Sequence, residues 1–142
     1  MRLKSLAAGC ASVGFLPFFP ASKIPAVLAA GDVQVITVKK GLEGVVVPSK
    51  LYGILAAGKP ILAVAEKSCD IRAIADGRNC GRSASPESVA ETVQAMEALS
   101  AGGASADFLK QMGEAARRVA PEFERQGELQ KFVQFVEAAS RS

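Results

Sequence analysis

The stretch "KKGLEG", residues 39–44, places one carboxylate between two glycines. Glu43 is flanked by Gly41 and Gly44. A carboxylate accepts hydrogen bonds from hydroxyl groups such as those of a sugar or a ribose. Glycines without a side chain let the backbone approach a ligand closely. These three residues are therefore candidates for binding a hydroxyl-rich ligand, and a solvated loop glutamate is the simpler alternative.

A second candidate feature follows at the start of a predicted helix. Pro48 leads into a helix that begins near Ser49 and ends at Gly58. The first N–H groups of this helix, those of Ser49, Lys50 and Leu51, lack partners within the helix, and the helix dipole favours an anion beside them. Lys50 opposes that dipole unless an anion such as phosphate neutralises it. The pattern thus indicates either a phosphate-binding turn or an ordinary solvated lysine.

Strands and helices alternate up to about residue 85, and helices follow. This order predicts an α/β fold, with a partial Rossmann-like parallel sheet and a helical tail. In open α/β sheets, ligands bind beyond the carboxyl ends of the strands and against helix N-termini. The loop after strand 33–38 and the helix from Ser49 make such a place. The expected strands are 13–19, 33–38, 60–65 and 80–83, and the expected early helices are 23–30, 49–57 and 69–75.

Tyr52 is the sole tyrosine and lies one turn from Leu55 and Ala56, so it either lines the candidate site or packs.

The three helices expected in the second part of the chain carry apolar stripes at helical spacing, which predicts that these faces contact the core. The stripes are Val89, Val93, Met96 and Leu99; Phe108, Met112, Ala115, Val119 and Phe123; and Leu129, Phe132, Val133 and Val136.

The composition excludes several functional classes. With 49% apolar and 22% charged residues, the chain is of the folded and not the disordered type. Its net charge of +3 comes without a Lys/Arg-rich run, which argues against nucleic-acid binding. There is no histidine, and Cys10, Cys69 and Cys80 form no CxxC pair, so no metal site is expected. The cysteines are interpreted as reduced thiols of a cytosolic protein.

Neither a secretory signal nor a membrane span is expected from the sequence. The opening "MRLKSLAAGC" has an apolar part shorter than the roughly 7–15 residues of a signal core, so it is interpreted as a helix end. No stretch reaches the roughly 20 apolar residues of a membrane span.

Residues 13 to about 100 resemble a known family. The stretches "PSKLYG" and "LAAGKP", at their spacing within "AAGDVQVITVKKGLEGVVVPSKLYGILAAGKPILAVAEKSCDIRAIADGRNC", are similar to the C-terminal half of bacterial retaining glycosyltransferases of the GT-B fold. The resemblance is to the group 1, or family-four, type, in the branch that builds O-antigen, capsule and exopolysaccharide. It implies transfer of a hexosyl group from a nucleotide-sugar donor, UDP- or GDP-linked, to a lipid-linked or polysaccharide acceptor.

The resemblance also implies roles for individual residues. Glu43 corresponds to the loop acid that holds the sugar, and Ser49 and Lys50 correspond to the turn that faces the diphosphate. Gly53 stands where the family commonly has a ribose-binding acid, so ribose recognition by a carboxylate is not implied. No catalytic residue, metal or separate cofactor is assigned. The predicted substrate-binding residues are Gly41, Glu43, Gly44, Pro48, Ser49, Lys50, Tyr52 and Gly53.

A complete enzyme of that family has two Rossmann-like domains, and acceptor contacts come chiefly from the first. The resemblance implies that residues 1–100 form part of the second, donor-binding domain and that residues 101–142 form its helical tail. In the strand order 3-2-1-4-5-6, strand 13–19 would be the third, and strand 33–38 would have an open edge. We therefore expect a donor-binding fragment that is inactive alone and needs an N-terminal acceptor domain or a homo-oligomeric partner.

Two alternatives to this interpretation remain at the level of the sequence. One is a non-catalytic nucleotide-sugar binding or scaffold remnant that pairs with a separate N-terminal chain. The other is a small phosphate-ester hydrolase, which is disfavoured because Asp32 and Asp70 are too isolated to supply a catalytic cluster. The expected location is the cytoplasm, at the inner face of the membrane if the acceptor is lipid-linked, although no segment of the sequence identifies a membrane contact.

Overall fold

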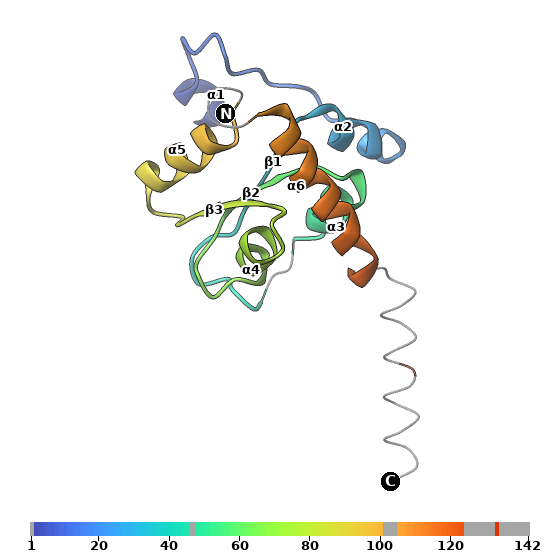
Figure 1. Cartoon of the computed structure of the whole chain (residues 1–142). Helices are drawn as coiled ribbons and strands as arrows, with labels where there is room; N and C mark the ends of the chain where they lie inside the picture. Colours follow the sequence, from blue (N-terminus) through green and yellow to red (C-terminus); the bar gives the residue numbers. More distant parts are fainter. Residues whose placement is uncertain (1, 46–47, 101–104, 124–132, 134–142) are drawn as a thin grey trace.

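The computed structural model describes residues 2–45, 48–100, 105–123 and 133. It contains a three-stranded parallel sheet in the order β1-β2-β3, with helices on its two faces (Figure 1). The predicted α/β fold class, part of a Rossmann-like sheet, is therefore confirmed. The strands are β1 Gln34–Thr37, β2 Ile61–Val64 and β3 Gly81–Ala84. The helices are α1 Arg2–Leu6, α2 Ile24–Ala30, α3 Lys50–Ala57, α4 Asp70–Gly77, α5 Val89–Ala98 and α6 Ala106–Val119, with 3-10 turns η1 Ala21–Lys23 and η2 Ala120–Phe123.

Alternate residues of β2 face opposite sides of the sheet, and helices cover each side. Ile61 and Ala63 belong to the larger apolar cluster, which includes residues of α3, α4 and the later part of α6. Leu62 belongs to a second cluster with Ala95 of α5 and Met112 of α6. Because α6 contributes to both clusters, it helps to bury both faces of the central strand, as parallel sheets require.

The contact between α3 and α6 is very short because a glycine lies on each side. Gly58 ends α3 in the left-handed conformation, with φ of 65°, which glycine adopts without a steric penalty. Gly113 is buried in α6, and a Cβ atom there would collide with the carbonyl oxygen of Gly58. Any side chain at position 113 must therefore push the two helices apart.

The predicted strand at 13–19 is wrong. This segment forms no strand, and the apolar side chains of Val13, Phe15 and Leu16 are exposed. A strand needs a partner, and Pro17 and Pro20 have no N–H group to donate to one. The β-type composition alone therefore does not produce a strand here. The open edge predicted for β1 is present, since among the described residues β1 pairs with β2 alone.

The predicted stripe on α5 is also wrong in part. Val89, Val93 and Met96 are exposed, and the helix packs on the sheet through Ala95 and Leu99 instead. A small alanine brings the helix backbone close to β3, which turns the larger side chains outward.

The stripe on α6 is confirmed, with Met112, Ala115 and Val119 buried. The helix gives way to a 3-10 turn that contains Pro121, as the late bend predicted at that proline requires. The predicted last helix, around residues 129–136, lies outside the described residues apart from Val133. Within the part of the chain that the structure describes, no helix combines the length and apolar character needed to cross a bilayer.

Replacing Gly113 tests the α3–α6 contact. Gly113→Ala should lower the free energy of unfolding by about 1–3 kcal/mol, because the new methyl group overpacks against a backbone carbonyl. Gly77→Ala in α4 is the matched control, since a Cβ there meets no atom within 4 Å. Urea unfolding of both variants measures the difference, and equal midpoints would contradict the close contact.

The three cysteines provide a second test of the fold. Cys10 is exposed, whereas Cys69 and Cys80 are buried, and burial raises the pKa of the Cys80 thiol. A buried thiol that stays protonated reacts slowly with a disulfide reagent. In the native protein at neutral pH, Cys10 should react first and the other two only as the chain unfolds. Mass spectrometry of the labelled peptides checks this order, and rapid labelling of Cys80 would count against the packing of α4 on β3.

Candidate functional site

The loop after β1 consists of two consecutive turns. The N–H of Leu42 donates to the carbonyl of Lys39, and the N–H of Val45 donates to the carbonyl of Leu42, each at 3.2 Å. Gly41 and Gly44 are the third residues of these turns and have φ of 84° and 75°. A positive φ of about 80° at the third position is typical of type II turns and favours glycine. Turn geometry thus explains both glycines of this loop.

The same turns fix the direction of the predicted sugar-binding acid. The half-buried Glu43 accepts hydrogen bonds from the N–H of Gly41, at 3.1 Å to Oε1 and 2.9 Å to Oε2. An ionised carboxylate has about four acceptor positions, so capacity for ligand hydroxyls remains. The contact therefore holds Glu43 in one orientation without using up its ability to bind.

One of the three N–H groups predicted to be free at the start of α3 is hydrogen-bonded. The N–H of Leu51 donates to the carbonyl of Pro48 at 2.9 Å, so the expectation that it is free is wrong. Among the described residues, the N–H groups of Ser49 and Lys50 have no recorded acceptor. The Ser49 side chain also makes no capping hydrogen bond. With respect to the described residues, the start of α3 therefore has two N–H groups that an anion could use.

Lys50 is the first residue of α3, and its side chain reaches the open edge of the sheet along β1. Its ammonium group donates to the carbonyl of Val35 in β1, at 3.2 Å, and the side chain is exposed. An ammonium has three N–H donors, so two remain for a second acceptor. The contact brings a positive charge next to the first turn of α3 and covers one outward carbonyl of β1.

Tyr52 and Gly53 make packing contacts. The Tyr52 ring lies 5.8 Å from the ring of Phe123, centroid to centroid, which agrees with the alternative that it packs. It also lines a cavity of about 120 Å³ together with Gly44 and Asp70, at the carboxyl edge of the sheet. A Cβ at Gly53 would lie 2.7 Å from Cδ1 of Leu28, so this glycine allows α2 to approach α3.

An ion pair that the sequence did not indicate crosses the carboxyl edge of the sheet. Lys40, after β1, and Glu87, after β3, are joined at 3.0 Å between Nζ and Oε2. The hydrogen bond and charge of Glu87 raise the pKa of Lys40. Because β2 lies between these strands, the pair spans the carboxyl end of the central strand. No sequence spacing could have predicted a contact between residues 47 positions apart.

Arg72 and Glu91 make hydrogen bonds beyond the carboxyl ends of β2 and β3. Arg72 donates to the carbonyl of Ala65 at 3.1 Å and to Oγ of Ser85 at 3.4 Å. Glu91 accepts from the N–H and the hydroxyl of Ser85 at 2.9 and 2.7 Å, which lowers the pKa of its carboxyl group. The start of α5, capped by Ser88, is thereby tied to the end of β3.

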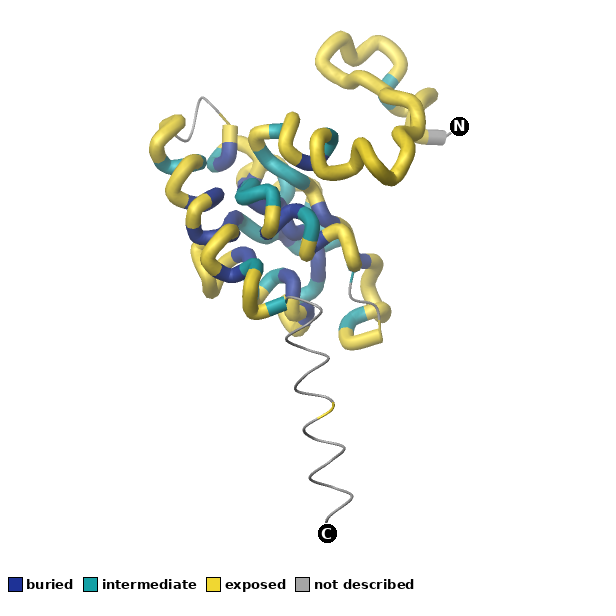
Figure 2. The backbone as a smooth tube through the Cα atoms, turned by 90° about the vertical axis from the view of Figure 1, so that its right-hand side faces the viewer, coloured by how far each residue is buried: buried dark blue, intermediate teal, exposed yellow. Residues whose placement is uncertain are grey.

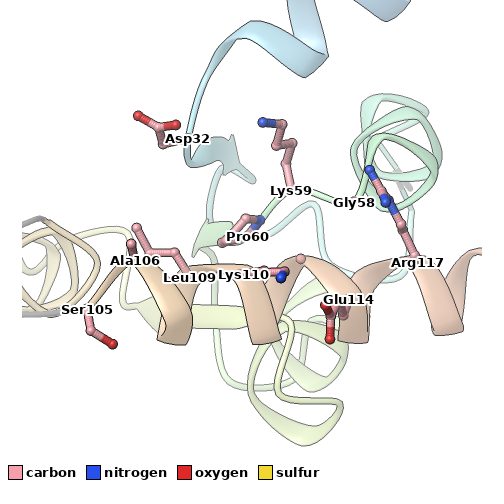
Figure 3. A pocket seen from close by; sticks show the side chains of 11 residues that line it. Asp32, Gly58, Lys59, Pro60, Ser105, Ala106, Leu109, Lys110, Glu114 and Arg117 are labelled. Atoms are coloured by element: carbon pink, nitrogen blue, oxygen red, sulfur yellow. The ribbon is translucent and has the colours of Figure 1, made fainter.

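The larger cavity lies at the opposite edge, where the strands begin (Figure 3). It measures about 610 Å³ and contains none of the predicted site residues. Asp32 precedes β1 and Pro60 precedes β2, and α6 forms one wall. Its charged lining residues form no ion pair within the described part of the chain. They are Asp32, Lys59, Lys110, Glu114 and Arg117.

Half of the chain is similar to a known protein. A protein of Pseudomonas aeruginosa, the probable glycosyltransferase WbjE, is 43% identical to this chain over 75 residues. This chain is similar to part of a glycosyltransferase. The match takes in 50% of this chain and 19% of WbjE, so the chain spans about a fifth of the length of that relative. No protein-family model matches the chain, and no solved structure matches it.

The similarity to WbjE thus confirms the predicted resemblance to a glycosyltransferase. The GT-B fold, the family-four type and the roles of individual residues stay predictions.

The turn geometry of the loop is open to a direct test. Gly44→Ala should lower the free energy of unfolding by about 1–2 kcal/mol, because an L-residue is strained at positive φ even where space is free. Gly14→Ala is the matched control, since neither position has an atom within 4 Å of the added Cβ and Gly14 has no positive φ. Thermal unfolding measures both, and an equal effect at the two positions would rule out the turn as described.

Proposed function

We propose that this chain is the donor-binding part of a glycosyltransferase and holds a UDP- or GDP-linked sugar at the carboxyl edge of its sheet. The single observation that carries the proposal is the 43% identity to a probable glycosyltransferase over half of the chain. The position of Glu43 in the loop that follows β1, and that of Lys50 at the start of the next helix, α3, support the choice of site.

In this proposal, the start of α3 binds the diphosphate. The N–H groups of Ser49 and Lys50 and the Lys50 ammonium supply donors and positive charge at one place. Sugar transfer with retention depends mainly on positioning and on stabilising the charge of the departing diphosphate. A preorganised cation and helix start meet that requirement without a protein base.

Glu43 binds the sugar in the same proposal. Its contact with Gly41 orients the carboxylate, and its remaining acceptor positions receive the sugar hydroxyls. Ribose is not assigned to Gly53, because this glycine faces α2. The acceptor, a lipid-linked or polysaccharide chain, is bound by a further domain or partner chain, so this chain alone binds the donor without transferring it.

The experiment is thermal unfolding of the purified chain with UDP, GDP and UDP-sugars. A nucleotide at ten times its Kd should add about 1.4 kcal/mol of stability and raise the Tm by about 4 °C, because only native-state binding stabilises in this way. Lys50→Ala should raise the Kd at least about tenfold, since a charge-assisted hydrogen bond to phosphate is lost.

Lys59→Ala is the matched control, because Lys59 follows the other end of the same helix and lines the cavity at the opposite edge. It should leave the Kd unchanged. If no nucleotide shifts the Tm, or if the two lysine variants weaken binding equally, the carboxyl edge is not the donor site.

A further inference from the structure

One polar contact joins the loop after β1 to a distant part of the chain. In this β1 loop, residues 39–45, two turns are closed by the loop's own hydrogen bonds. Beyond these, the described residues record a single polar contact between the loop and another segment, the ion pair of Lys40 with Glu87. This pair therefore helps to set where the β1 loop lies relative to the end of β3.

The residues around Glu87 are well fixed. Glu87 lies in a turn in which the N–H of Ser88 donates to the carbonyl of Ser85 at 3.1 Å. Ser85 donates its N–H and its hydroxyl to the carboxylate of Glu91 in α5, at 2.9 and 2.7 Å. Because these bonds connect the end of β3 to α5, Glu87 lies on a fixed segment, and the β1 loop is the part that its contact holds in place.

Lys40 connects this contact to the predicted sugar-binding acid. It directly precedes Gly41, whose N–H donates to both carboxylate oxygens of Glu43, at 3.1 and 2.9 Å. The peptide group that orients Glu43 is therefore the one that joins Lys40 to Gly41. A shift of Lys40 moves this N–H group and changes the direction of the Glu43 carboxylate.

The ion pair contributes little to the stability of the whole fold. The side chains of Lys40 and Glu87 are 59% and 71% exposed, outside the buried interior that Figure 2 shows in dark blue. Water screens such charges, so the pair adds little to the free energy of unfolding. Its effect is therefore expected on the local geometry of the β1 loop.

We propose that Glu87 is a positioning residue for the sugar of the donor. Through Lys40 and the peptide group of Gly41, it holds the carboxylate of Glu43 in the direction that receives sugar hydroxyls. The diphosphate binds at the start of α3 in the proposed function, so Glu87 acts on the sugar and not on the nucleotide. The inference rests on the proposed function and adds to it a residue from beyond β3.

The test is isothermal titration calorimetry of the full chain with UDP and UDP-glucose, and with GDP and GDP-mannose. Glu87→Gln keeps the shape of the side chain and removes its charge. It should raise the Kd of the nucleotide-sugar about two- to fivefold, the effect of losing an exposed ion pair, and leave the Kd of the nucleotide unchanged. Lys40→Gln should act in the same way, and the double variant should cost no more than either single variant, because the two side chains act as one pair.

The first step can be measured without a ligand. In NMR spectra of the free chain, hydrogen exchange of the Gly41 N–H should be about two- to fivefold faster in Glu87→Gln, because its acceptor Glu43 is held less firmly.

The matched control is Glu122→Gln, which breaks the exposed ion pair of Arg78 with Glu122. This control should leave both Kd values and the exchange of Gly41 as in the wild type. The proposal is overturned if Glu87→Gln leaves the exchange of Gly41 unchanged, if it weakens nucleotide and nucleotide-sugar equally, or if the control has the same effect. A wild-type chain that binds neither nucleotide refutes the proposed function, and the role of Glu87 in sugar binding falls with it.

Discussion

The burial of both faces of β2 is the constraint on which the rest of the structure depends. A central parallel strand needs an apolar layer on each side. The helices that follow β1 and β2, α3 and α4, cover one face. The other face depends on α5 and on α6, which comes from much later in the chain. Because α6 reaches both layers, the short contact between Gly58 and Gly113 fixes the position of α3 as well.

Much of this fold could be predicted from local sequence. The β-branched run of β1 and the apolar run of β2 fixed two strands, and Gly58 fixed the end of α3. The sequence failed where the result depends on a neighbour. An apolar, β-type segment at 13–19 does not become a strand without a partner, and prolines within it remove donors. On α5, the choice between Ala95 and the larger side chains was decided by the distance to the sheet.

The candidate site shows the same division. Residue types and spacing indicated the glycines of the loop, the acid Glu43 and the helix start. They could not indicate that Lys50 contacts the carbonyl of Val35 or that Lys40 pairs with Glu87. The first contact depends on how α3 packs beside β1, and the second on the positions of β1 and β3 on either side of β2. Gly53 differs from these residues, since the glycine that stands where the resemblance implies a ribose-binding acid lies against Leu28 of α2.

The contacts of α3 with α6 and with Phe123 have a consequence for synthesis on the ribosome. The loop, the helix start and Lys50 are all translated before α6 exists. Until α6 and η2 have emerged, neither the contact of Gly113 with Gly58 nor that of Phe123 with Tyr52 can form. The nascent chain therefore carries every residue of the candidate site well before α3 can make its contacts with α6 and η2. The last described helix, which contributes none of the predicted site residues, decides when that site is complete.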